Sequence, residues 1–322
     1  MNHDRDNAPA PIFTTEWLTR LRCLSLQAQR AGAASLFTPR PRKLPAGGTE
    51  ATGVRDYSPG DDLRYVDWHL CARRDEVLTR TFEGTAERHL AVLLDVSRSM
   101  EVRPAGVGAA EGGDETVPPR SKFRLARQIV AAAGCWALEN AAVFSLATFS
   151  GGLGPSLPAL RGGRQTMRLL RFLEGLQLQD SPTDLCGAAA TLARRFPRRG
   201  PVVVVSDLLG GEGFTRGLDL LRHQGYGPRV VHLFAPEDAK PPRLGDVELV
   251  DCETGIRQRA TITERAAARY GQLFGRFLEE VAAYCRQHTL PWLQLSTDTT
   301  EEQVMRAVLG LPNTTRRSTC VA

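Results

Sequence analysis

A regular alternation of short apolar runs and helical patterns, from Leu90 to Leu309, constrains the fold most. The run 202–205 consists only of valine, which is typical of a strand buried on both faces of a sheet. Strands are expected at 90–94, 141–149, 155–160, 202–205, 230–234 and 292–295, and helices at 121–140, 164–176, 184–196, 214–224, 263–288 and 301–309. Because helices between strands require right-handed crossovers, the pattern predicts an α/β fold with a doubly wound, mostly parallel sheet and helices on both faces.

The remaining segments suggest appendages to this core. A helix is expected at 15–29, a strand at 77–82, and a hairpin from 247–251 and 257–261 around Glu253-Thr254-Gly255. We expect four regions: an N-terminal helix and Pro/Gly-rich arm (1–50), a charged segment packed on the core (51–89), the α/β domain (90–310) with a flap insertion (101–120), and a flexible tail (311–322).

The formal net charge of +5 invites a nucleic-acid function, but the 41 basic residues are dispersed and mostly interleaved with acids. Short basic clusters occur at 39–43 and 194–199, without the series of interleaved aromatic side chains that would stack on bases. We therefore expect no nucleic-acid partner.

The seven cysteines are isolated from one another, as expected for free thiols in a reducing compartment. The N-terminus lacks the apolar region of a signal peptide, and no run approaches the ~18 apolar residues of a membrane span. These features predict a cytoplasmic protein without a membrane span.

Three short segments carry side chains suited to a metal ion. Asp95, Ser97 and Ser99 follow one expected strand, Asp207 follows another, and Thr183 lies in a loop before a helix. Because ligands collect at the carboxyl ends of parallel strands, these loops are expected to lie at one edge of the sheet. Hydroxyl and carboxylate oxygens suit Mg²⁺, with Mn²⁺ or Ca²⁺ as alternatives. Each residue also has an ordinary interpretation as a turn or helix-cap residue.

The order strand-DxSxS, loop-TD, strand-SD resembles the von Willebrand factor A domain and its metal-ion-dependent adhesion site. The resemblance implies that Ser97, Ser99 and Thr183 offer hydroxyl oxygens, while Asp95 and Asp207 contribute charge, partly through water. The Gly/Pro-rich insertion 101–120 departs from that pattern, because the next helix normally follows almost at once.

Such a site favours binding over catalysis. Two carboxylates and three hydroxyls leave a divalent ion with an exchangeable position, which a carboxylate from a partner can fill. No histidine adjoins Asp95, Thr183 or Asp207 in the sequence to activate water. We therefore expect a non-enzymatic docking site. The alternative is a structural module whose site is vestigial and holds no ion.

The segment 55–74 is dense in charge and leaves three interpretations open. Ion pairs such as Asp62 with Arg64, or Asp67 with Arg73, would make it structural. It could instead be a partner-recognition surface formed by Asp61, Asp62, Arg64, Asp67, Trp68 and Arg73. A third interpretation is a metal-dependent phosphoester hydrolase whose acids are Asp56, Asp61, Asp62 and Asp67, although no lysine or histidine sits among them.

The segment from Tyr57 through PGDD to Arg73, followed by DxSxS-Met, is similar to the family called domain of unknown function 58. The likeness extends from about Thr52 to Leu309. It implies partnership with a MoxR-type AAA+ ATPase in the assembly or maturation of other complexes. The sequence has no GxxxxGK[ST] motif, so ATP hydrolysis would take place on that partner.

Overall fold

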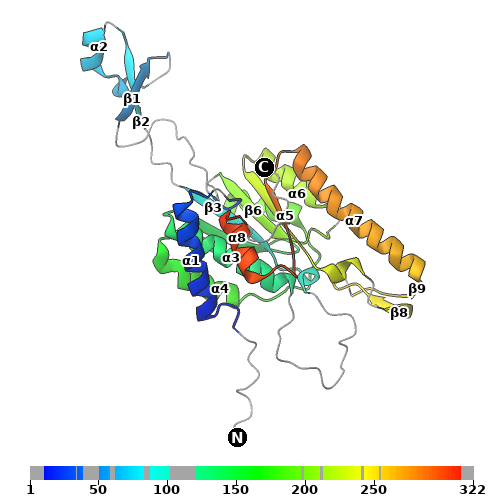
Figure 1. Cartoon of the computed structure of the whole chain (residues 1–322). Coiled ribbons are helices and arrows are strands. Elements are labelled where there is room, and N and C mark those ends of the chain that lie inside the picture. The colour runs from blue at the N-terminus through cyan, green and yellow to red at the C-terminus, as the bar shows by residue number, and fades with distance from the viewer. Residues whose placement is uncertain are drawn as a thin grey trace. The chain divides into compact units, whose positions relative to one another are not determined.

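The computed structural model describes residues 11–33, 35–38, 51–58, 62–74, 76–82, 88–101, 121–196, 199–210, 213–240, 243–253 and 255–312. The chain divides into two compact units (Figure 1). One unit combines Met1–Pro39 with His89–Ala322, and the other is Arg40–Arg88. The expected insertion 101–120 lies outside the described residues except for Glu101, as does the expected tail except for Leu311 and Pro312.

A six-stranded sheet forms the centre of the larger unit. Its order is β10 (Trp292–Ser296), β7 (Gly227–Phe234), β6 (Pro201–Ser206), β3 (His89–Asp95), β4 (Val143–Phe149) and β5 (Leu153–Arg161). Neighbouring strands are parallel except β4 and β5, which are antiparallel. Only residues 150–152 join β4 to β5, too few for the crossover that a parallel pair requires. The mostly parallel sheet predicted from the sequence is confirmed.

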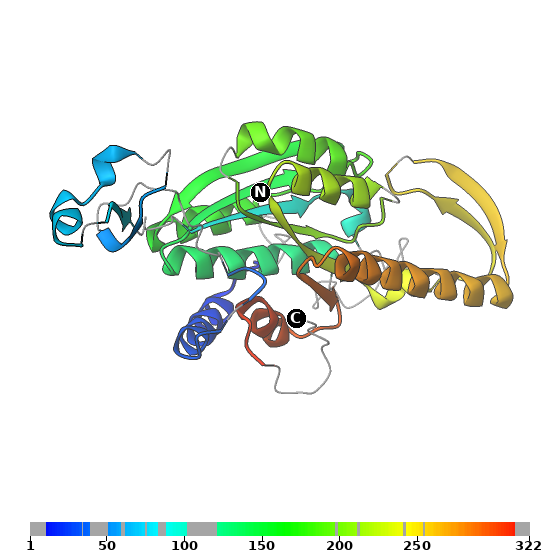
Figure 2. The same cartoon turned by 90° about the horizontal axis from the view of Figure 1, so that it is seen from above.

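Helices cover both faces of this sheet, also as predicted (Figure 2). One face is covered by α1 (Thr15–Arg30), α3 (Lys122–Glu139), α4 (Thr166–Glu174) and α8 (Glu301–Leu309). The other is covered by α5 (Leu185–Arg195), α6 (Gly213–His223) and part of α7 (Glu264–Gln287). Every residue of β3 and β4 is buried, which is why their sequences are continuously rather than alternately apolar.

A local signal, the N-cap residue Ser121, sets where helix α3 begins. The Ser121 hydroxyl accepts a hydrogen bond of 3.0 Å from the Arg124 N–H and so caps α3, as expected for a serine before an apolar helix. Along α3, apolar residues occur on nearly all sides, because the helix packs between the sheet and the helices α4 and α8.

The predicted hairpin is present as β8 (Gly245–Val250) and β9 (Arg257–Ile262). Most of its side chains are exposed. Figure 2 shows it curving between the start of α7 and the body of the larger unit. Within the described part of the chain, no helix has the length and apolarity needed to cross a bilayer.

The smaller unit contains an antiparallel pair, β1 (Ala51–Asp56) and β2 (Leu78–Phe82), and the short helix α2 (Trp68–Arg74). The sequence predicted β2, but β1 was missed because its residues are charged or small rather than alternately apolar. The Val66 and Leu78 side chains are buried in this unit.

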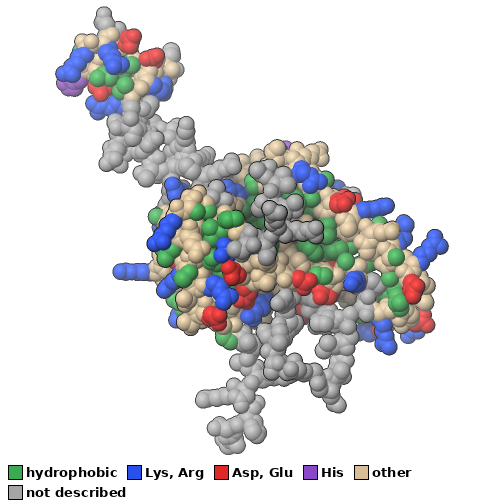
Figure 3. All heavy atoms as spheres, viewed as in Figure 1, with side chains coloured by type: hydrophobic (Ala, Val, Ile, Leu, Met, Phe, Trp, Pro, Cys, Tyr) green, Lys and Arg blue, Asp and Glu red, His purple; other side chains and the backbone are tan. Residues whose placement is uncertain are grey.

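Charged side chains of both signs are interspersed on the face shown in Figure 3. Lysine and arginine side chains there are interrupted by acidic and apolar ones and form no continuous stripe.

Candidate metal-binding site

The predicted metal ligands on β3 and β6 lie at the same edge of the sheet. Asp95 is the last residue of β3, and Asp207 directly follows the last residue of β6, Ser206. The two strands are parallel neighbours, so their carboxyl ends meet. Asp95, Ser97 and Asp207 are all buried.

A chain of polar contacts connects four of the five predicted ligands. The Ser97 N–H donates to Asp95 Oδ1 at 2.9 Å, and the Ser206 hydroxyl donates to Asp95 Oδ2 at 2.5 Å. The Ser97 and Ser99 hydroxyl oxygens are 2.9 Å apart, and the Ser99 hydroxyl donates to Asp207 Oδ1 at 3.3 Å. Carboxylate and hydroxyl oxygens therefore converge within a few ångströms.

The loop with the fifth predicted ligand, Thr183, is fastened to this edge. The Gln179 N–H donates to the Val96 carbonyl at 2.8 Å, and the Asp184 N–H donates to the Ser150 carbonyl at 2.6 Å. Asp184 then caps α5, since its carboxylate accepts from the Gly187 N–H at 2.9 Å.

Thr183 itself contacts a residue that sequence reasoning placed only in a turn. Its hydroxyl donates to Glu253 Oε1 at 3.0 Å, and its N–H donates to Glu253 Oε2 at 3.2 Å. A Cβ added to Gly210 would lie 3.3 Å from the Thr183 carbonyl, so Thr183 also packs against the loop that follows Asp207. No sequence signal linked the hairpin tip to this edge.

Two further charged residues at the edge were not predicted as part of the site. Lys122, at the start of α3, is buried, and its Nζ lies 2.8 Å from Asp207 Oδ2 and 2.9 Å from Asp238 Oδ2. Asp238 belongs to the 3₁₀ helix η4 (Pro236–Ala239) that follows β7. Burial acts to lower the pKa of Lys122, but attraction to Asp207 and Asp238 outweighs it and the pKa is raised. Lys122 is therefore a fixed positive charge.

The charges of this cluster do not balance without a cation. With Asp95, Asp207 and Asp238 all ionised, the Lys122 ammonium leaves two excess negative charges, and a proton on Asp95 in the metal-free protein relieves one of them. Burial, and then repulsion from Asp207, raise the pKa of Asp95 to about 7 in spite of hydrogen bonds from Ser206 and Ser97. Hydroxyl and carboxylate donors with a surplus of two negative charges fit a hard divalent cation such as Mg²⁺.

The turn after β6 is held in a strained conformation. Leu208 has a φ of 56°, in the left-handed region that non-glycine residues rarely adopt, and its N–H donates to the Ser206 hydroxyl at 2.9 Å. The His232 Nε2 donates to the Asp207 carbonyl at 3.1 Å. Burial lowers the pKa of His232 to about 4, so this histidine is neutral. His232 is thus a hydrogen-bonded core histidine, and it positions the Asp207 backbone.

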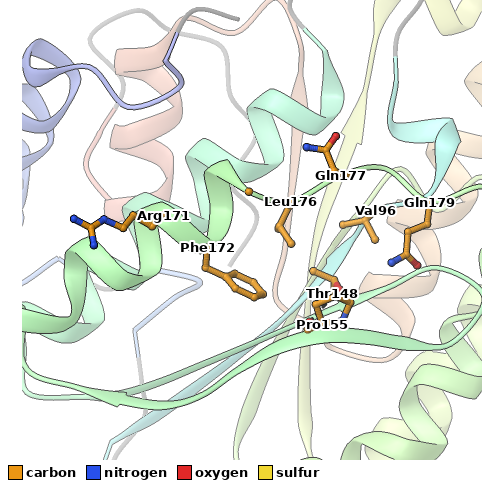
Figure 4. A pocket seen from close by; sticks show the side chains of 9 residues that line it. Val96, Thr148, Pro155, Arg171, Phe172, Leu176, Gln177 and Gln179 are labelled. Carbon is orange, nitrogen blue, oxygen red and sulfur yellow. Dashed lines mark hydrogen bonds between the residues drawn. The ribbon is translucent and has the colours of Figure 1, made fainter. Parts of the chain in front are cut away.

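A cavity of about 380 Å³ lies behind the Val96 turn (Figure 4). Phe172 and Leu176 of the α4 region face Thr148 and Pro155 across it, and Gln179 stands at its end. Its lining includes apolar side chains and no carboxylate, so it offers no cation site.

The ion pairs of the smaller unit agree only partly with the sequence. Arg64 pairs with Asp62 at 2.6 Å, as predicted, and hydrogen bonds from Arg64 lower the pKa of Asp62. Asp67 pairs with Arg80 at 2.9 Å rather than with Arg73, because Arg80 lies on β2 beside the start of α2. The prediction of an Asp67–Arg73 pair was wrong.

The other proposed partner-binding residues are placed as follows. Trp68 is 64% exposed and Arg73 is exposed, whereas Asp61 lies outside the described residues. Two of the four acids of the hydrolase alternative are thus paired with arginines. Within the described ranges, no three histidine, cysteine, aspartate or glutamate side chains are grouped to hold a metal. A metal site in the described part of the chain would therefore need hydroxyl ligands beside its carboxylates, as at the edge of the sheet.

Comparison with known proteins finds relatives over most of the chain. "Uncharacterized protein Rv1480" of Mycobacterium tuberculosis is 27% identical over 261 residues, which cover 79% of this chain and 77% of the relative. "Uncharacterized protein MAV169" of Mycobacterium avium is 32% identical over 117 residues, 36% of this chain and 68% of the relative.

Among solved structures, the chain is similar to the "conserved hypothetical protein BatB" of Bacteroides thetaiotaomicron, with 13% identity and a TM-score of 0.40 over 69% of this chain and 96% of that one. It is also similar to proximal thread matrix protein 1 from mussel byssus, whose structure is described as having a zinc-occupied MIDAS motif, with 11% identity and a TM-score of 0.34 over 69% of this chain and 44% of that one. The family described as "Protein of unknown function DUF58" matches residues 53–274, more than half of the chain, and the chain therefore belongs to that family.

Proposed function

We propose that this chain is a non-enzymatic protein-binding adaptor that docks an acidic side chain of a partner on a divalent cation. Asp95, Ser97, Ser99, Thr183 and Asp207 would hold the ion, with Mg²⁺ preferred for this oxygen set and Mn²⁺ or Ca²⁺ as alternatives. The observation that carries the proposal is the chain of contacts from the buried Asp95 and Ser97 through the half-buried Ser99 to the buried Asp207. The bound ion would supply a positive charge with an exchangeable position for a carboxylate.

The ionisable side chains nearest this chain of contacts support binding rather than catalysis. The Lys122 ammonium is engaged by two carboxylates, and the neutral His232 is engaged with the Asp207 backbone. A general base must be able to exchange protons with substrate or water near neutral pH. Lys122 and His232, whose pKa values are raised and lowered respectively, are poorly suited to this role. Asp95 has a pKa of about 7 in the metal-free protein, but as a ligand of the ion its carboxylate would be ionised and engaged.

The partner that the family resemblance implies is a MoxR-type AAA+ ATPase, which would act with this chain in assembling or maturing a client complex. Besides the carboxylate docked on the ion, this contact would use a second surface on the unit Arg40–Arg88, where Leu63 is 60% and Trp68 is 64% exposed. Exposed tryptophan and arginine side chains are enriched among the residues that dominate protein interfaces. Asp62, Arg64 and Arg73 would surround this apolar pair.

The proposal is tested with Asp95→Ala and the control Asp246→Ala, whose side chain lies exposed on β8. Calorimetric titration with Mg²⁺ and Mn²⁺ should give saturable binding for the wild type and the control and none for Asp95→Ala. The wild type and Asp246→Ala should capture a MoxR-type ATPase and Asp95→Ala should not, and chelator should abolish the capture. Equal capture by all three proteins, with and without chelator, would contradict the adaptor role.

The hydrolase alternative is tested on the same samples. Phosphoester and nucleic-acid panels with Mg²⁺ or Mn²⁺ should show no turnover. Turnover that depends on Asp56 would establish the alternative.

A further inference from the structure

The tip of the β8–β9 hairpin places a carboxylate at the candidate metal site. Glu253 contacts Thr183 with both oxygens, accepting from the hydroxyl at 3.0 Å and from the N–H at 3.2 Å. Thr183 is one of the five residues that would hold the ion. Glu253 carries a carboxylate, the same group that a partner would place in the exchangeable position of the ion.

The local structure of the tip holds Glu253 in this position. The Glu253 N–H donates to Asp251 Oδ1 at 2.8 Å, and the Gly255 N–H donates to the Asp251 carbonyl at 2.9 Å. Gly255 has a φ of 71°, which a residue with a side chain adopts only with strain. These hydrogen bonds fix the backbone of Glu253 and Gly255 relative to Asp251.

The hairpin that carries this tip has little to hold it in place. Most side chains of β8 and β9 are exposed, including Leu249 and Val250. A two-stranded hairpin without a buried face is only marginally stable in water. Release of the Glu253 contact would therefore disturb little of the apolar core.

We propose that Glu253 is an internal ligand of the metal site, which occupies the exchangeable position until the acidic side chain of a partner displaces it. This inference rests on the proposed function, and it adds Glu253 as a sixth ligand residue that competes with the partner's carboxylate. The hairpin keeps Glu253 close to the ion in the absence of a partner. Because the tether keeps Glu253 beside the site, an external carboxylate must compete with a high effective concentration.

The test uses Mn²⁺ as the probe on the full chain, with Glu253→Gln and the control Glu248→Gln. Glu248 is on the same hairpin and forms an exposed pair with Arg257 at 3.4 Å. Asp95→Ala defines binding elsewhere on the protein. Titration calorimetry gives the Mn²⁺ affinity, and water-proton relaxation reports how many water molecules exchange on the bound ion.

Loss of one carboxylate ligand should weaken Mn²⁺ binding by about tenfold in Glu253→Gln and leave Glu248→Gln unchanged. The bound Mn²⁺ should relax water protons more strongly in Glu253→Gln, because a water replaces the carboxylate. Added acetate, against chloride at equal ionic strength, should reverse the relaxation change in Glu253→Gln and have little effect on the wild type.

Three results would overturn the inference. Equal Mn²⁺ affinity and relaxation in the wild type and Glu253→Gln would leave the metal site intact and reduce Glu253 to a structural contact of Thr183. An acetate response that is the same in the wild type and Glu253→Gln would show that Glu253 does not compete. Absence of saturable Mn²⁺ binding in the wild type would overturn the proposed function together with this inference.

Discussion

Asp95 is a buried carboxylate. Its burial and the neighbouring Asp207 raise its pKa to about 7, whereas an aspartate in an unfolded chain has a pKa of about 3.9. Between these values the folded, metal-free protein keeps a proton that the unfolded chain has lost. Its free energy of unfolding therefore falls as the pH rises from about 4 towards 7, by up to about 4 kcal/mol from this group.

Asp95→Asn removes this titration, so the metal-free variant should become more stable than the metal-free wild type as the pH rises above about 5. Saturating Mg²⁺ should stabilise the wild type at pH 7.5 and leave the variant unchanged. Urea unfolding at several pH values, with chelator and with Mg²⁺, measures both effects. A stability difference between the two proteins that does not vary with pH would contradict the raised pKa.

Lys122 is the only cation within hydrogen-bonding distance of Asp207 among the described residues. Lys122→Met would leave Asp207 and Asp238 close together and uncompensated, so we expect a loss of about 3–5 kcal/mol in the free energy of unfolding at neutral pH. The control Lys240→Met removes an exposed lysine and should change it by less than about 0.5 kcal/mol. Equal urea midpoints for the two variants would exclude a structural role for the buried ion pairs.

At the residue scale, the sequence predicted the members of the site that follow strands. Asp95 directly follows a continuous apolar run and Asp207 follows another after one serine, and the topology of a parallel sheet then brings them to one edge. Lys122, Asp238 and Glu253 were not predicted, because each comes from a different part of the chain and local patterns do not indicate long-range contacts. Lys122 had a local signal, the Ser121 cap, but the cap fixes only where α3 begins.

At the scale of elements, the packing of α5 on α6 positions the Thr183 loop. A Cβ added to Gly217 of α6 would lie 2.6 Å from Leu185 Cγ and 3.0 Å from Leu185 Cβ, and Leu185 is two residues after Thr183. Gly217→Ala must therefore push α5 away. We expect a loss of about 1–3 kcal/mol in the free energy of unfolding, in spite of the better helix propensity of alanine.

Gly275 provides the matched control for this substitution. It lies exposed on α7, and an added Cβ would meet no atom within 4 Å. Gly275→Ala should raise the free energy of unfolding by up to about 1 kcal/mol, since only helix propensity changes. Urea unfolding of both variants decides the point. A stabilised Gly217→Ala would mean that α5 and α6 are not closely packed.

The elements differ in how well the sequence predicted them. The core strands and helices were predicted to within a few residues, because their apolar patterns are strong. The hairpin β8–β9 was predicted from its turn, but its exposed strands gave no indication that the tip returns to Thr183. The antiparallel direction of β5 follows from the short β4–β5 connection, because residues 150–152 are too few for a crossover.

At the scale of the whole molecule, the chain combines two units of unequal core size. The larger unit buries apolar residues on both faces of a six-stranded sheet. The described part of Arg40–Arg88 buries few, among them Val66 and Leu78. Backbone amides of the smaller unit should therefore exchange with solvent through openings of lower free energy than amides of β3 and β6.

Mg²⁺ should act on these units unequally. A ligand that binds only the folded larger unit stabilises it by RT ln(1 + [L]/Kd), which is about 2.7 kcal/mol at a concentration of 100 Kd. In hydrogen-exchange mass spectrometry, amides of β3 and β6 should become more protected with Mg²⁺, while those of β1 and β2 remain unchanged. Asp95→Ala should abolish the effect on β3 and β6. Equal gains in protection for β2 and β6 would show that the two units open together rather than independently.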